Sequence, residues 1–227
     1  MQLKICVSVM ERTVQRTLRV VRQLEQHDPD LFEIRLDLMK STSSIGQIRR
    51  TTDRPMIATN RSRNGGGFFS GTEEARMETL IRAVQDGFDY VDVELNTKNV
   101  NKFVRHLEQG GARAIVSYHN EKTTPELPAL QSILKREKDA GADVCKIVTT
   151  AKSYADNLRC LAFLNKHARK TRLVCFAMGR LGVPSRILSP IFGAYFTFAS
   201  SGVGKETAAG QVPVNSLKDF YNEFGIA

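Results

Sequence analysis

The chain has 227 residues, of which 41% are hydrophobic and 25% are charged, so its composition is that of a folded globular protein and excludes a largely disordered one. No window approaches the roughly 18 consecutive apolar residues of a membrane span, and the start carries no signal-peptide pattern, so we expect a soluble cytoplasmic protein. The formal net charge of +9 suits an acidic small substrate. Nucleic acid is disfavoured as a partner, because the basic residues are spread along the chain. Those within residues 12–22 have the spacing of a solvated helix face.

Short apolar segments rich in β-branched residues alternate along the chain with segments of helical period. The predicted strands cover residues 3–9, 31–37, 55–60, 90–95, 113–119, 144–150, 172–178 and 194–200. The predicted helices cover residues 12–26, 73–87, 99–111, 125–141 and 154–170, with weaker patterns at 43–52 and 184–192 and a last helix at 215–225. Gly87, Gly110 and Gly141 follow helical segments, where we expect them to form left-handed C-terminal caps.

Eight strand and helix units in this length predict an α/β protein with the (β/α)8 TIM-barrel fold, built as one compact domain over residues 1–227. A doubly wound open sheet is the alternative. That fold usually has a glycine-rich phosphate turn after its first strand, and this chain has "SVMERT" there. In a barrel, the active site lies at the C-terminal ends of the strands.

Cysteine and histidine spacing indicates no metal site and no disulfide framework. The four cysteines and four histidines are far apart from one another, without a C-x-x-C or H-E-x-x-H pattern. We therefore expect buried, reduced thiols and no metal ion.

Ionisable residues stand inside two predicted strands, although both faces of such strands are covered. Glu33, Arg35 and Asp37 alternate with apolar residues, so period two places all three on one face, directed into the barrel. Asp92 and Glu94 do the same in a later strand. These five residues either form a buried salt-bridge layer or hold a substrate, with arginine binding a carboxylate or hydroxyl groups.

Lys146 lies in the middle of the sixth predicted strand and shares a face with Val144 and Val148. One interpretation is a lysine whose stem packs while its amine reaches a carboxylate at the barrel mouth. The other is a Schiff-base lysine, because burial favours the neutral amine that attacks a carbonyl. His119 ends the preceding strand, where an imidazole beside an iminium would be placed to remove a proton from the adjacent carbon.

Seven segments in order, from "FEIRLD" through "IATNRSRNGGG", "VDVEL", "VSYHN", "GADVCKIV" and "FAMGRLGVPSRILSPIFGAYFTFAS" to "TAAGQVP", resemble the type I 3-dehydroquinate dehydratases over nearly the whole chain. The resemblance implies a lyase of the shikimate pathway that dehydrates 3-dehydroquinate without a cofactor, commonly as a homodimer. It also implies that Lys146 forms an imine with the substrate ketone and that His119 is the general base and acid.

The resemblance assigns further positions to the substrate pocket. Polar groups that would hold the carboxylate and hydroxyls of the substrate are Ser8, Glu33, Arg35, Arg61, Arg186, Thr207 and Gln211. Met178 and Phe198 match positions of an apolar wall.

The chain departs from the family pattern at Gly65, where a glutamate next to the base histidine is common. We therefore expect Asp92 or Glu94 to support His119 instead. Two smaller departures are Asn120, where aspartate is usual, and Thr207, which would supply a hydroxyl usually given by serine.

Two other functions stay open at the level of the sequence. An aldolase or transaldolase barrel would also use a lysine on the sixth strand, and its phosphate loop would have to be residues 200–210. A non-catalytic barrel that binds a polyanion would explain the basic charge, but it leaves the inward-facing carboxylates, His119 and Lys146 without a role.

Overall fold

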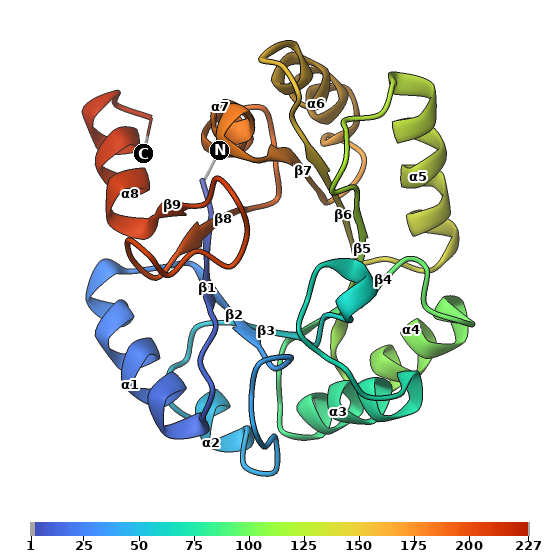
Figure 1. The fold of residues 1–227 in the computed structure, drawn as a ribbon, viewed down its shortest axis with the longest axis vertical. Helices are drawn as coiled ribbons and strands as arrows, with labels where there is room; N and C mark the ends of the chain where they lie inside the picture. Colours follow the sequence, from blue (N-terminus) through green and yellow to red (C-terminus); the bar gives the residue numbers. More distant parts are fainter. Residues whose placement is uncertain (1–2, 227) are drawn as a thin grey trace.

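The computed structural model describes residues 3–226, whose strands form one curled parallel sheet surrounded by helices (Figure 1). The order of the strands in the sheet is β7-β6-β5-β4-β3-β2-β1-β8-β9. Their bounds are β1 Ile5–Val9, β2 Leu31–Arg35, β3 Met56–Thr59, β4 Tyr90–Glu94, β5 Arg113–His119, β6 Val144–Thr150, β7 Leu173–Met178, β8 Thr197–Ser200 and β9 Val212–Pro213.

The helices follow the strands in sequence and pack on the outside of the sheet (Figure 1). Their bounds are α1 Val14–Leu24, α2 Gly46–Arg49, α3 Glu73–Gln85, α4 Val100–Gln109, α5 Leu127–Asp139, α6 Ala155–His167, α7 Val183–Leu188 and α8 Val214–Glu223. The order of elements and the curled parallel sheet confirm the predicted α/β barrel class. Whether residues 1–227 form one domain stays a prediction, because residues 1, 2 and 227 lie outside the described part.

The sheet closes less completely than eight paired strands would. Among residues 3–226, β7 and β8 share no strand pairing, and the bond from Tyr195 N to Leu173 O, at 2.9 Å, joins their starts. Strand β8 begins at Thr197, three residues after the start predicted from its apolar run. The two-residue strand β9, which the sequence did not predict, pairs in parallel with the end of β8.

Helix ends confirm two of the three predicted glycine caps. Gly87 and Gly141 have φ values of 88° and 92°, in the left-handed region. The prediction for Gly110 is wrong, because this residue keeps a right-handed conformation with φ −79° and the left-handed position is Gly111, with φ 91°. The left-handed cap of helix α4 is therefore Gly111, one residue later than the predicted Gly110.

Alternation along the strands divides the core into two parts. Side chains such as Val144, Val148 and Phe198 fill the inside of the barrel, whereas Cys145 and Ile147 pack between the sheet and the outer helices. All four cysteines are buried and form no disulfide. Lys146, which lies between Cys145 and Ile147, therefore points to the inside.

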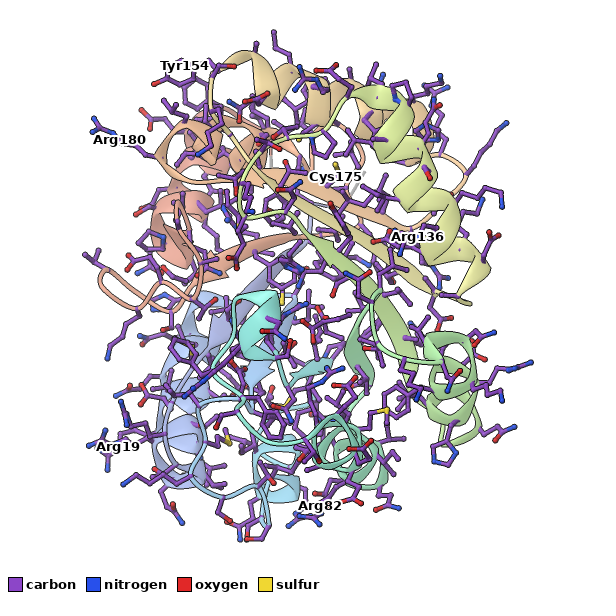
Figure 2. All side chains as sticks on the ribbon, turned by 45° about the vertical axis from the view of Figure 1, so that its right-hand side comes forward. Arg19, Arg82, Arg136, Tyr154, Cys175 and Arg180 are labelled. Carbon is purple, nitrogen blue, oxygen red and sulfur yellow. The ribbon has the colours of Figure 1, made fainter. Side chains whose placement is uncertain are left out.

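Much of the basic charge lies on the outside of the helical ring. In Figure 2, Arg19 of α1 and Arg180 extend away from the protein, whereas Cys175 of β7 lies in the interior. Within residues 3–226, no helix combines the length and apolar character needed to cross a membrane.

Candidate active site

A cavity of about 320 Å³ lies at the C-terminal ends of the strands. Every residue that the sequence analysis assigned to catalysis or substrate binding lines it: Ser8, Glu33, Arg35, Arg61, His119, Lys146, Met178, Arg186, Phe198, Thr207 and Gln211. Asp92 and Glu94, the two predicted supporting residues, are not part of the lining. The fold thus brings together side chains from six strands, from the loops after β3 and β8, and from helix α7.

Lys146 projects from β6 into this cavity and is only 4% exposed. Its Nζ lies 2.8 Å from Asp92 Oδ2 and 3.7 Å from Glu33 Oε1. It also lies 4.2 Å from the centroid of the Phe198 ring. The amine is therefore held at one point by two carboxylates and an aromatic face, rather than reaching out to solvent.

A chain of hydrogen bonds connects Glu33 with the loop that covers the cavity. The Ser8 hydroxyl donates to Glu33 Oε2 at 2.6 Å, and the Thr59 hydroxyl donates to Oε1 at 2.9 Å. Gln211 Nε2 donates to Ser8 Oγ at 3.2 Å, and the amide N of Thr207 donates to Gln211 Oε1 at 2.7 Å. Hydrogen bonds thereby link the 207–211 segment to the groups around Lys146.

Asp92 lies beneath the cavity and binds three polar side chains. It accepts hydrogen bonds from Arg61 Nη2 at 2.9 Å, from Ser117 Oγ at 2.6 Å and from Lys146 Nζ at 2.8 Å. Burial by itself would raise the pKa of Asp92, but the charges of Arg61 and Lys146 lower it below the usual range. Asp92 is consequently a fixed anion that orients both cations.

Arg35 is oriented by a bidentate ion pair. Its Nε and Nη2 atoms donate to the two carboxylate oxygens of Asp37 at 2.9 and 2.7 Å. Burial opposes the cation, but Asp37 more than compensates and raises the pKa of Arg35. Asp37 also accepts the amide of Phe68 at 3.0 Å, which attaches the loop after β3 to this pair.

Arg186 differs from the other arginines of the cavity because no carboxylate pairs with it among the described residues. Its Nε and Nη2 atoms are buried without hydrogen-bond partners, and its guanidinium lies 4.3 Å from the centroid of the Phe176 ring. Burial lowers the pKa of Arg186 to about 9, although the charge of Glu33 acts in the opposite direction. A buried cation with unused donors is suited to bind an anion that enters the cavity.

His119 ends β5 on the wall of the cavity, and the parallel register places it beside Val148 of β6. Burial and the charges of Arg61 and Lys146 lower the pKa of His119 well below its usual value, and Asp92 acts in the opposite direction. The imidazole is therefore neutral at pH 7 and able to accept a proton. Its Nδ1 is buried without a hydrogen-bond partner among the described residues.

Glu94 occupies the space next to Gly65. Its carboxylate accepts the Ser62 hydroxyl at 3.0 Å and pairs with Arg76 Nη1 at 3.1 Å. A Cβ atom at residue 65 would overlap Glu94 Oε1, so a larger residue there would require the Glu94 side chain to shift. Glu94 forms no hydrogen bond with His119 in the described part, and Asp92 acts on the imidazole through its charge alone.

Several residues of the site were not singled out from the sequence. Ser117, which bonds Asp92, shares the inward face of β5 with His119, so alternation could have identified it. Phe176 lies under Arg186 and follows the inward period of β7. Arg76, from helix α3, and Glu121, from the loop after β5, gave no comparable signal, because helix and loop positions have no strand alternation.

A buried lysine on an inward strand face, with a neutral histidine on the adjacent strand and arginines for an anion, defines a barrel enzyme of the Schiff-base class. The family model described as type I 3-dehydroquinase matches residues 5–227. The chain belongs to the type I 3-dehydroquinase family.

Curated relatives and solved structures agree with this assignment. The 3-dehydroquinate dehydratase of Desulfotalea psychrophila is 33% identical over 224 residues, covering 97% of this chain and 98% of the relative. The enzyme of the same name from Methanothermobacter thermautotrophicus is 34% identical and covers 98% of each chain. The crystal structure of 3-dehydroquinate dehydratase from Geobacillus kaustophilus superposes with a TM-score of 0.91 at 25% identity, covering 99% of this chain and 91% of the other. Family membership therefore favours the dehydratase over the aldolase and polyanion-binding alternatives.

Proposed function

We propose that Lys146 and His119 dehydrate 3-dehydroquinate to 3-dehydroshikimate, a step of the shikimate pathway. The Lys146 amine adds to the C3 ketone and, with loss of water, forms an imine. His119 removes a proton from C2, and the electron pair moves toward the imine nitrogen. The electrons then return and expel the C1 hydroxyl, which takes the proton from His119 and leaves as water. Hydrolysis of the imine releases the product and restores the amine.

The observation that carries these roles is the position of the Lys146 amine. It lies in the cavity, 4% exposed, and β6 pairs with the strand that ends at His119. The dehydratase activity itself follows from the family, since this chain is a hydro-lyase of the type I 3-dehydroquinase family. The geometry of the site supports the residue roles.

The direct test is reduction of the enzyme with borohydride during turnover of 3-dehydroquinate. We expect a stable adduct with the mass of the reduced imine on the peptide that contains Lys146, because borohydride converts the imine into an amine that cannot hydrolyse. Mass spectrometry of the digested protein locates the adduct. An adduct on another lysine, or turnover without any adduct, would disprove the assignment of Lys146.

Arg186 is proposed to bind the substrate carboxylate, because it is a buried cation of the cavity whose Nε and Nη2 donors have no partner among residues 3–226. We expect Arg186→Met to raise KM by roughly 10- to 100-fold, the value of one or two charge-assisted hydrogen bonds. The same change should leave the thermal midpoint unchanged or raise it, since it removes a buried cation that no carboxylate neutralises. Steady-state kinetics and calorimetry together check both effects, and a variant with unchanged KM would contradict the role.

We further propose that the protein acts in the cytoplasm, without a cofactor, as a homodimer. Tyr154 and Leu158, which are 67% and 70% exposed and one turn apart at the start of α6, support an apolar contact between two copies. Light scattering on the purified protein measures the oligomeric state.

A further inference from the structure

Glu121 lies on the rim of the active-site cavity, two residues after His119. The turn that carries it is fixed by Asn120, whose side-chain Oδ1 accepts the amides of Lys122 at 2.9 Å and Thr123 at 3.0 Å. The backbone of Asn120 is also held, because its carbonyl accepts the Thr150 hydroxyl at 2.9 Å. The start of the Glu121 side chain is therefore set by the strand ends, although the side chain itself is exposed.

The carboxylate of Glu121 rests on the glycine-rich loop after β3. A Cβ atom at Gly66 would overlap Glu121 Oε1, and Gly66 has φ 78°, so a glycine at this position admits the carboxylate. The neighbouring Gly65 admits Glu94 in the same way. Glu94 is already engaged with Arg76 and Ser62, whereas Glu121 has neither an ion pair nor a hydrogen bond within residues 3–226.

Proton transfer to His119 creates a charge that the surrounding groups oppose. Arg61 from the loop after β3, Lys146 of β6 and Arg35 of β2 all disfavour the imidazolium, and Asp92 of β4 is the carboxylate that favours it. Asp92 is itself shared between Arg61 and Lys146. Removal of the C2 proton neutralises the Lys146 iminium and places the positive charge on His119, so an additional anion near the imidazole favours this step.

We propose that Glu121 supplies this anion: as a positioning residue on the rim, its carboxylate stabilises the protonated form of His119 during the elimination. The proposal rests on the proposed function, in which His119 is the base. It assigns to the loop after β5 a role that residue 65 cannot fill, because a glycine carries no side chain.

The test compares Glu121→Gln with Glu108→Gln, a matched change at an exposed glutamate on α4. We expect Glu121→Gln to lower kcat roughly 10-fold and to increase the kinetic isotope effect of 3-dehydroquinate deuterated at C2, because proton removal becomes slower. The acid limb of kcat/KM should move to lower pH, since loss of a nearby negative charge disfavours the imidazolium. Borohydride trapping on Lys146 should be unchanged, and Glu108→Gln should behave as the wild type.

The possible outcomes separate this proposal from the function on which it depends. If the wild type neither turns over 3-dehydroquinate nor is trapped on Lys146, the proposed function fails. If the wild type does both and Glu121→Gln matches Glu108→Gln in kcat and in the acid limb, only the role of Glu121 is wrong. A Glu121→Gln protein that loses trapping together with activity would also contradict it, because Glu121 would then shape the site for imine formation.

Discussion

Lys146→Ala is expected to lower dehydratase activity by at least about four orders of magnitude, because a covalent mechanism without its nucleophile retains only binding and electrostatic effects. No borohydride adduct should form on the 144–150 peptide. The Nζ atom is held 2.8 Å from Asp92 and 4.2 Å from the Phe198 ring, and within residues 3–226 no other lysine lines the cavity. Without Lys146, no other lysine in the described part of the cavity could form the imine.

Two companion variants show whether the loss is chemical. Lys146→Met keeps most of the buried volume, and Lys146→Arg keeps a positive charge for Asp92 and Glu33. Both should fold, judged by circular dichroism and thermal unfolding, and both should be as inactive as Lys146→Ala. Substantial turnover by the alanine or methionine variant would show that Lys146 only neutralises the two carboxylates.

The barrel could be predicted because its strands carry two independent sequence signals. Each strand is an apolar, β-branched run of the right length, and ionisable residues within the runs alternate with apolar ones, as in Glu33 to Asp37. Helix α2 and helix α7, with only 4 and 6 residues, were the weakest patterns, since so few residues establish no helical period. Strand β9 is defined by its pairing with β8, and such a pairing cannot be predicted from the local sequence of two residues.

Much of the cavity lining could be predicted from the sequence, but the partners of those residues could not. The strand pattern placed Lys146 and His119 on neighbouring strands, and the resemblance assigned Arg186, which lies on helix α7, to the substrate pocket; all three line the cavity. Which carboxylate approaches each cation depends on side-chain packing across different strands. Glu94 was an expected partner of His119, yet its carboxylate lies against Gly65 and pairs with Arg76.

The network around Glu33 suggests why the loop after β8 belongs to the site. Gln211 reaches Ser8, which donates to Glu33, and Glu33 lies 3.7 Å from the Lys146 amine. The amide of Gly179 donates to Ala209 O at 3.0 Å, and a Cβ at Gly210 would overlap the carbonyl of Gly179. This close backbone approach fixes the loop over the cavity.

His119→Ala is expected to reduce kcat by about 10²- to 10⁴-fold, the usual contribution of a general base. Imine formation should persist, so borohydride should still trap substrate on Lys146 while product formation is slow. The wild type should show an acid limb of kcat/KM below the ordinary histidine value of 6.5, because burial and the charges of Arg61 and Lys146 lower the pKa of His119. Since the base must be neutral to act, activity is lost only as the pH falls through that lowered value, and His119→Ala should lack this limb.

Single-turnover experiments distinguish a base from a structural role for His119. If His119 removes the C2 proton, deuterium at C2 should slow the step after trapping reaches its maximum, and the trapped fraction during turnover should rise in His119→Ala. His119→Gln, which keeps a polar side chain but has no basic nitrogen, should resemble the alanine variant. Equal loss of trapping and turnover in both would show that His119 mainly holds the site in shape. His119 Nδ1 is buried and has no hydrogen-bond partner in residues 3–226, so nothing there anchors the ring through that atom. We therefore expect the results that mark His119 as the base.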